Sequence, residues 1–320
     1  MSGQIVIGVD GGGSRTTAVA ASKDGRLLSV AHGEGINYNT IGMDEARRRL
    51  RKVVEQLLQS CGARDIRFIS VGMSALDGPA TAEVLNQFAG GEFPTEKLIL
   101  DSDANAALYA ATLGGKGTIV ICGTGSMVQS SDGRGNVRVG GGWGVVTGDP
   151  GSGYQLATDG LRAATAAWDG IAQPTMLCAE AFAFFGADKP RSLIEKIYAP
   201  EMNAALLARF SKQVEKCAAD GDHVAITVIE RNMYDLASIA AATAFEAEGQ
   251  TFWLYGGVFE NSELMRKIFS LALAKLACGS STRVLDVSPS VGALLYGYKM
   301  LGELTSEVEN AIKTTYKEVF

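Results

Sequence analysis

Two stretches of this chain share one pattern: a β-branched strand, a glycine-rich turn with hydroxyl side chains, a second strand and then Asp-Gly-Arg. They occupy residues 5–26 and 119–134. The alternation after each turn and the Asp-Gly pair predict hairpins, and not strands that feed helices. A repeat over so long a distance indicates two related domains and not a solenoid of short units. A chain of 320 residues is long enough for two domains with sizeable cores.

The turn of the first copy carries groups that suit the phosphates of a nucleotide. The glycines at 11–13 lack a Cβ, so backbone N–H groups can approach an anion closely. Ser14, Thr16 and Thr17 add hydroxyl donors, and Asp10 is placed to hold a hydrated cation. No lysine follows the glycines and no helix is expected after them, which argues against a P-loop and a dinucleotide fingerprint. Either loop alone could be a tight turn, but two loops facing each other across a cleft would hold a polyphosphate from both sides.

Composition narrows the classes of function. The net charge of −6 argues against nucleic acid and against an anionic membrane surface as partners. No apolar run approaches the roughly 20 residues of a membrane span. The first strand begins near the N-terminus, so we expect neither a signal peptide nor a DNA-binding head before it. The five cysteines are scattered and lack Cys-x-x-Cys spacing, which indicates reduced thiols in the cytoplasm and not disulfides, zinc or an iron–sulfur cluster.

Hydrophobic periodicity and turn residues predict further strands and helices in both halves. Strands are expected at 27–32, 66–73, 97–100, 251–255 and 284–287. Helices are expected at 43–61, 81–90, from 103, at 262–277, from 289 and at 305–320, with a helical region at 154–248 that breaks at 219–222. The glycine-rich segment 140–154 is expected to be a long loop in which Trp143 offers an apolar platform.

One aspartate stands out as a candidate for chemistry. The short buried strand at 97–100 leads into Asp101, Ser102 and Asp103, and a helix of small residues begins there. Asp101 or Ser102 could cap the start of that helix. Asp103 is then left to act as a base.

Seven motifs occur in an order that resembles a known family. They are Asp-Gly-Gly-Gly-Ser at 10–14, the loop of Asn37, the helix of Asp103, Gly-Thr-Gly-Ser at 123–126, Gly-Gly-Trp-Gly at 141–144, Gly-Asp-x-Gly-Ser-Gly at 148–153 and Gly-Gly-Val-Phe-x-Asn at 256–261. The sequence resembles the sugar-kinase branch of the actin/Hsp70/hexokinase superfamily, and more closely the N-acetylglucosamine kinase and BadF/BadG/BcrA/BcrD ATPase family. The resemblance covers nearly the whole chain.

The resemblance implies an α/β fold of two duplicated ribonuclease H-like (actin-like ATPase) domains with an interdomain cleft. The N-terminal lobe would comprise residues 1–102 and a terminal helix at about 298–320. The C-terminal lobe would comprise residues 103–297.

The resemblance also implies a role for each matching residue. Asp10 would help to hold Mg²⁺, and Asp103 would accept the proton of the sugar 6-hydroxyl as it attacks the γ-phosphoryl group of ATP. The residues implied for ATP are Asp10, Gly11, Gly12, Gly13, Ser14, Thr16, Gly123, Thr124, Gly125, Gly256, Gly257 and Asn261. Those implied for the sugar are Asn37, Asp103, Ser126, Gly142, Trp143, Gly144 and Asp149.

The implied activity is ATP-dependent phosphorylation of an amino sugar at its 6-hydroxyl, with N-acetyl-D-glucosamine as the leading substrate. Glucosamine and N-acetylmuramic acid are alternatives, because this chain departs from the family near the loop for the sugar 2-substituent. Pro150 stands where the family usually has an acidic residue, and Gln155 stands where it often has tryptophan.

Two other classes of protein share this resemblance. An ATPase that activates a partner redox enzyme would need cysteines that bridge an iron–sulfur cluster, and the spacing here offers no such arrangement. A sugar-sensing repressor would need an N-terminal helix-turn-helix. We therefore expect ATP and Mg²⁺ as cofactors, an amino sugar as the small-molecule partner, and a cytoplasmic homodimer.

Overall fold

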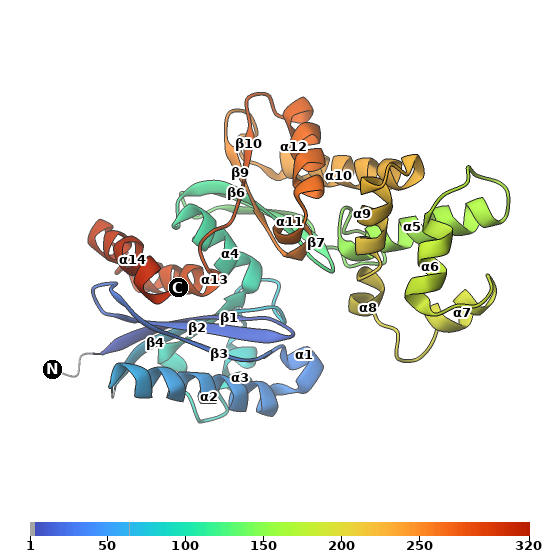
Figure 1. The fold of residues 1–320 in the computed structure, drawn as a ribbon. Coiled ribbons are helices and arrows are strands. Elements are labelled where there is room, and N and C mark those ends of the chain that lie inside the picture. The colour runs from blue at the N-terminus through green and yellow to red at the C-terminus, as the bar shows by residue number, and fades with distance from the viewer. Residues whose placement is uncertain (1–3, 64) are drawn as a thin grey trace. The chain divides into compact units, whose positions relative to one another are not determined.

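The computed structural model describes residues 4–63 and 65–320, and the chain divides into two compact units. Unit 1 comprises Met1–Lys116 and Leu285–Phe320, and unit 2 comprises Gly117–Val284. Each unit is built on a five-stranded sheet with helices around it (Figure 1). The α/β fold that the family resemblance implies is confirmed.

The sheet of unit 1 has the strand order β3-β2-β1-β4-β5. Its strands are β1 (Ile5–Gly11), β2 (Arg15–Ser22), β3 (Leu27–Glu34), β4 (Ile66–Met73) and β5 (Leu98–Ser102). β1, β2 and β3 form an antiparallel meander, whereas β1, β4 and β5 run parallel to one another. The first predicted hairpin is therefore confirmed, and the parallel strands end at one edge of the sheet.

Helices cover both faces of this sheet. They are α1 (Tyr38–Ile41), α2 (Met43–Cys61), α3 (Ala82–Ala89), the short η1 (Thr95–Lys97), α4 (Asp103–Thr112), α13 (Pro289–Met300) and α14 (Ser306–Val319). Side chains alternate between the two faces of a strand, so β1 feeds two cores. Ile7 and Val9 pack in the core that α2 completes, and Val6 packs in the core that α13 and α14 complete.

The boundaries of the units differ from those expected, which were 102/103 and 297/298. Helices α4 and α13 both belong to unit 1. The reason is their close approach: a Cβ added at Gly292 of α13 would lie 1.8 Å from the carbonyl oxygen of Ala106 in α4. Gly8 makes a similar approach possible between β1 and α13, where an added Cβ would lie 2.2 Å from the carbonyl oxygen of Ser290.

Unit 2 repeats the strand order of unit 1. Its strands are β6 (Lys116–Cys122), β7 (Ser126–Asp132), β8 (Val137–Gly141), β9 (Thr251–Tyr255) and β10 (Ser281–Val284). Read from the other edge, the order β8-β7-β6-β9-β10 matches that of unit 1 strand for strand. The inferred duplication is therefore visible in the topology as well as in the glycine-rich turns.

Two strands of unit 2 differ from expectation. β8 was not predicted, and the last strand is Ser281–Val284 and not 284–287. β10 is an edge strand that pairs only with β9, and its residues alternate between exposed and half-buried. None of its side chains is fully buried, so its sequence carries little of the apolar signal of a strand. The apolar residues that follow it shifted the predicted strand to 284–287.

The helices of unit 2 are α5 (Gly153–Trp168), α6 (Leu177–Phe185), α7 (Ser192–Ile197), α8 (Ala204–Ala208), α9 (Ser211–Ala219), α10 (His223–Thr243), α11 (Gly257–Asn261) and α12 (Glu263–Leu276). The predicted break at 219–222 is confirmed, because Asp222 caps α10 by accepting from the backbone N–H groups of Val224 and Ala225 at 2.9 and 3.0 Å. Within the described residues, no helix combines the length and the apolar character needed to cross a membrane.

Candidate active site

Three parallel strands of unit 1 end together, and the polar candidates of this unit lie at that edge. Asp10 of β1 is opposite Gly72 of β4, which is opposite Asp101 of β5. Asp103 begins α4 immediately after β5. Ligands of open α/β sheets bind at the carboxyl ends of the strands. The register therefore brings the Asp10 turn and Asp103 to an edge suited to a ligand.

The glycine-rich turn after β1 is anchored mainly through its carbonyl oxygens. The carbonyl oxygen of Gly12 accepts from the N–H of Ile36 at 3.1 Å. Gly35 lies so close to the turn that a Cβ added to it would be 2.2 Å from the carbonyl oxygen of Gly13. A Cβ added at Gly13 itself would meet nothing within 4 Å. The turn thus leaves space beside Gly13 in which an anion could approach the backbone.

Thr16 lies in the sheet next to this turn. Its side chain is buried, and its hydroxyl donates to the carbonyl oxygen of Glu34 at 2.8 Å. This hydroxyl already has a partner within the sheet, whereas Ser14 is exposed in the turn. Ser14 is therefore better placed than Thr16 for a phosphate.

Asn37 caps the short helix α1 and is linked to the end of β4. Its Oδ1 accepts from the N–H of Asn39 at 3.0 Å, and its Nδ2 donates to Oγ of Ser74 at 3.1 Å. The N–H of Ser74 donates to the carbonyl oxygen of Gly11 at 3.1 Å. Ser74, which the sequence reading did not select, thus ties Asn37 to the first glycine of the turn.

The start of α4 is capped by Ser102, as the sequence suggested. Its Oγ accepts from the N–H of Asn105 at 3.1 Å. Asp101 is buried and accepts from the N–H of Ser102 at 2.6 Å and from Nδ2 of Asn105 at 2.9 Å. These two residues satisfy the helix end, so the Asp103 carboxylate is not needed as a cap.

The pKa of Asp103 is raised above that of an ordinary aspartate. Burial is the main cause, and the negative charge of Asp77 adds to it. A carboxylate with a raised pKa at a strand edge is a candidate general base. The sequence reading did not single out Asp77, which lies in the loop after β4.

The second glycine-rich turn rests on the start of α5. The carbonyl oxygens of Gly123 and Thr124 accept from the N–H groups of Gly153 and Tyr154 at 2.8 and 3.2 Å. A Cβ added at Gly125 would lie 2.5 Å from Oδ2 of Asp149. The turn is thus fitted both to a helix end and to the carboxylate of the next loop.

The loop between β8 and α5 presents Trp143 to solvent. The indole side chain is 78% exposed, and Gly142 and Gly144 on either side have left-handed φ angles of 71° and 85°. The backbone carbonyl oxygen of Trp143 accepts from the hydroxyl of Thr147 at 2.7 Å. An exposed indole on a backbone fixed in this way suits contact with the apolar face of a ligand.

Asp149, in contrast, is buried in the same loop. It is 5% exposed, has a φ of 60°, and accepts from the N–H of Gly144 at 3.2 Å. Burial raises the pKa of its carboxyl. Ser126 is also buried, and its hydroxyl donates to the carbonyl oxygen of Pro150 at 2.7 Å. The Ser126 hydroxyl thus supports the loop.

The last motif lies beside the second turn, at the end of β9. Gly256 has a φ of 98°, and a Cβ added there would lie 2.6 Å from the carbonyl oxygen of Cys122. Asn261 closes the short helix α11 by donating from Nδ2 to the carbonyl oxygen of Gly257 at 2.8 Å. The structure therefore brings Gly256 next to the residue that precedes Gly123.

A comparison with known protein families matches residues 7–297 to the BadF/BadG/BcrA/BcrD ATPase family. The chain belongs to this family. The chain is similar to an N-acetyl-D-glucosamine kinase of Dictyostelium discoideum, which is 27% identical over 312 residues that span 92% of this chain and 98% of the relative. An N-acetylmuramic acid/N-acetylglucosamine kinase of Clostridium acetobutylicum is 25% identical over 281 residues, 85% of this chain and 92% of the relative.

A solved structure supports the same grouping. The candidate N-acetylglucosamine kinase of Chromobacterium violaceum superposes with a TM-score of 0.74 at 25% identity, and the match covers 93% of this chain and all of that chain. The fold of this chain is therefore similar to that of the solved structure along nearly its whole length.

The donor groups fit a magnesium ion that arrives with a nucleotide, as an ATPase family implies. Among the described residues, no group of three or more His, Cys, Asp or Glu side chains could hold a metal ion by itself. Mg²⁺ in nucleotide sites keeps several waters and takes one or two carboxylates besides the phosphates. Asp10, beside the first glycine-rich turn, is a carboxylate of the kind that this arrangement needs.

Proposed function

We propose that this protein is an ATP-dependent amino-sugar kinase that phosphorylates the 6-hydroxyl of N-acetyl-D-glucosamine. The observation that carries the proposal is the placement of Asp103, a half-buried carboxylate with a raised pKa at the sheet edge that also holds the Asp10 turn. The relatives that are named as kinases of N-acetylglucosamine, along nearly their whole lengths, support the same substrate class.

In the proposed reaction, Asp103 accepts the proton of the sugar 6-hydroxyl. The hydroxyl oxygen then forms a bond to the γ-phosphorus of ATP, and the bond from this phosphorus to the bridging oxygen breaks. The bonding electrons leave with ADP. Such transfers have a loose transition state, so positioning and charge neutralisation supply most of the rate. A general base adds roughly 10²–10⁴-fold.

The phosphates of ATP are assigned to the two glycine-rich turns. In unit 1 these are Gly11, Gly12, Gly13 and Ser14, and in unit 2 Gly123, Thr124 and Gly125. Mg²⁺, held through Asp10, would neutralise charge on the phosphate oxygens. The nucleoside is assigned to Gly256, Gly257 and Asn261, which lie beside the second turn.

The sugar is assigned to Asn37 and Asp103 of unit 1 and to the loop of Gly142, Trp143, Gly144 and Asp149 of unit 2. The Trp143 indole offers an apolar face, and Asp149 offers a carboxylate for a sugar hydroxyl. Ser126 contributes by supporting the loop. Pro150 and Gln155 lie at or next to this loop, so glucosamine and N-acetylmuramic acid remain the alternative substrates.

The test is an assay of ADP release with Mg·ATP and a panel of sugars: N-acetylglucosamine, glucosamine, N-acetylmuramic acid, N-acetylmannosamine and glucose. We expect N-acetylglucosamine to give the highest kcat/KM. ADP release that no sugar increases would contradict the proposal and favour an ATPase that activates a partner protein. The homodimer and the cytoplasmic location stay predictions, which light scattering and cell fractionation can check.

A further inference from the structure

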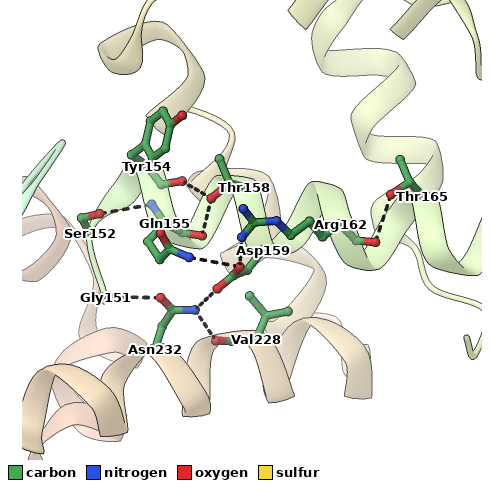
Figure 2. Close-up of polar contacts among 10 residues, drawn as sticks. All are labelled: Gly151, Ser152, Tyr154, Gln155, Thr158, Asp159, Arg162, Thr165, Val228 and Asn232. Carbon is green, nitrogen blue, oxygen red and sulfur yellow. Dashed lines mark hydrogen bonds and ion pairs between the residues drawn. The ribbon is translucent and has the colours of Figure 1, made fainter. Parts of the chain in front are cut away.

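The loop that carries Asp149 is anchored by a side chain from a distant part of unit 2. Asn232 of α10 is 2% exposed, and its Oδ1 accepts from the N–H of Gly151 at 3.1 Å. Its Nδ2 donates to Oδ2 of Asp159 at 2.9 Å and to the carbonyl oxygen of Val228 at 3.0 Å. Figure 2 shows this amide between the loop and the helices. Both of its N–H groups and its oxygen are therefore used.

Asp159 of α5 is itself held in place from its other side. Its Oδ1 accepts from Nε2 of Gln155 at 3.1 Å and from Nη1 of Arg162 at 2.7 Å (Figure 2). Since one carboxylate oxygen receives these two groups, the other oxygen is left for Asn232. The network thus fixes the orientation of the Asn232 amide as well as its position.

The Gly151 peptide is held at both of its polar ends. Its N–H donates to Asn232, and its carbonyl oxygen accepts from Sγ of Cys122 at 3.1 Å. Pro150 has no N–H to donate, so Gly151 supplies the first backbone N–H after Asp149. The bond to Asn232 thus fixes the peptide two residues after Asp149, and the next N–H, that of Ser152, donates to the carbonyl oxygen of Asp149 at 3.2 Å.

Open space borders one side of this part of the loop. A cavity of about 410 Å³ opens between the loop and helices α5 and α10, and Pro150, Asp159 and Asn232 are among the residues that line it. Asp149 has a left-handed φ of 60°, which residues other than glycine adopt at a cost. A conformation of this kind persists only where its surroundings determine it.

We propose that Asn232 is a positioning residue for phosphoryl transfer to the amino sugar. With Asp159 behind it, Asn232 fixes the Gly151 peptide and thereby holds the Asp149 carboxylate and the Trp143 loop in the geometry that binds the sugar. This inference rests on the proposed function, in which Asp149 and Trp143 contact the sugar. The second ATP turn touches this network at Cys122 and at Gly125. Asn232 itself contacts the loop assigned to the sugar, so we expect the larger effect on the sugar.

The first experiment measures hydrogen exchange at Gly151 in wild type and in Asn232→Ala. We expect the Gly151 amide to exchange about tenfold faster in the variant, because a buried donor loses its partner. An unchanged exchange rate would overturn the inference. This measurement needs no substrate, so it tests the anchoring role separately from the proposed function. The proposed function is contradicted independently if the wild-type protein phosphorylates no sugar.

The second experiment measures steady-state kinetics of the same variant. We expect the KM for N-acetylglucosamine to rise about tenfold or more, since small misplacements of a binding group are costly, while the KM for ATP changes less than about twofold. The control is Ile229→Ala, which removes a fully buried side chain from α10 one turn before Asn232. This control should lower the Tm and leave the sugar KM unchanged. Equal effects of the two variants on the sugar KM would overturn the inference.

A charge swap tests the partnership directly. Asn232→Asp places a second carboxylate against Asp159, so we expect the sugar KM to rise. Adding Asp159→Asn restores a donor and an acceptor between the two positions, and it should return most of the lost affinity. A double variant that is no better than Asn232→Asp alone would contradict the proposed role of the pair.

Discussion

Gly125 leaves room for the carboxylate of Asp149, since a Cβ at position 125 would lie 2.5 Å from Oδ2 of Asp149. This glycine therefore has a reason within the protein for lacking a side chain. Gly13 and Gly123 are different, because a Cβ added at either would meet nothing within 4 Å. Neither has a left-handed φ that would demand glycine. Contacts within the described residues thus do not require glycine at these two positions, which leaves their space open to the phosphates that we assign to the turns.

Gly13→Ala and Gly123→Ala should separate folding from nucleotide binding. We expect the Tm of each variant to equal or slightly exceed that of wild type. Alanine lowers the conformational entropy of the unfolded chain, which stabilises the folded state by about 0.4–1 kcal/mol. The KM for ATP should rise about tenfold as the methyl group occupies the space of a phosphate. Thermal melts and steady-state kinetics check both points. An unchanged KM for ATP would contradict the assignment of these two turns to the phosphates.

Replacing the proposed base should abolish turnover while the sugar still binds. For Asp103→Asn we expect kcat to fall roughly 10²–10⁴-fold, since the amide cannot accept the proton. Sugar affinity, measured by calorimetry, should be largely kept. Asp44→Asn, at an exposed carboxylate in the first turn of α2, serves as the control and should retain wild-type kcat. Wild-type kcat in Asp103→Asn would remove this residue from the mechanism.

The raised pKa of Asp103 predicts where activity is lost in acid. The base acts when ionised, so kcat/KM falls as the pH drops through its pKa. Because burial and the charge of Asp77 raise that pKa, the acid limb should lie above about 3.9, the ordinary value for aspartate. Asp77→Asn removes one of the two causes and should move the limb to lower pH. If the acid limb of the variant's pH profile does not move, the charge of Asp77 does not influence the group whose ionisation sets that limb.

Trp143→Ala tests the assignment of its loop to the sugar. The indole is largely exposed and makes little packing of its own, so the Tm should change little. The sugar KM should rise at least about tenfold, which corresponds to ~1.4 kcal/mol of binding free energy. The KM for ATP should stay within about twofold. A loss of ATP affinity instead would place the loop at the nucleotide.

Gly292→Ala should destabilise unit 1. The added Cβ would lie 1.8 Å from the carbonyl oxygen of Ala106 and 2.5 Å from the backbone nitrogen of Ala110, so α13 and α4 must separate. We expect the free energy of unfolding to fall by about 1–3 kcal/mol, as for other overpacked cores. Gly78→Ala, where a Cβ meets nothing within 4 Å, is the matched control. Equal stability of the two variants in urea would contradict the packing described.

Local features of the sequence predicted much of the fold. The two glycine-rich hairpins, helix α2 and the cap of α4 by Ser102 depend on residues close together in the chain. The misplaced boundaries of the units have another origin, because the contact of Gly292 with α4 joins distant segments. No local pattern reveals such a contact.

The same distinction applies to the candidate site. The glycine motifs and Asp103 are recognisable because their spacing along the chain is fixed by one turn or one helix start. Asn232 sits in the middle of a long, alanine-rich helix, and only folding places its amide at Gly151. The sequence offers one indication, an asparagine among the apolar residues of a helix, and this indication does not predict that Gly151 is its partner.

Unit 1 is assembled from both ends of the chain, and this has a consequence for synthesis. A ribosome delivers β1 to β5 first, then the whole of unit 2, and α13 and α14 last. Until those helices emerge, Val6, Val19 and Phe68 lack the apolar partners that complete their core. The nascent protein must therefore keep one sheet half-covered while the inserted unit is made, so this core of unit 1 can be completed only after the synthesis of unit 2.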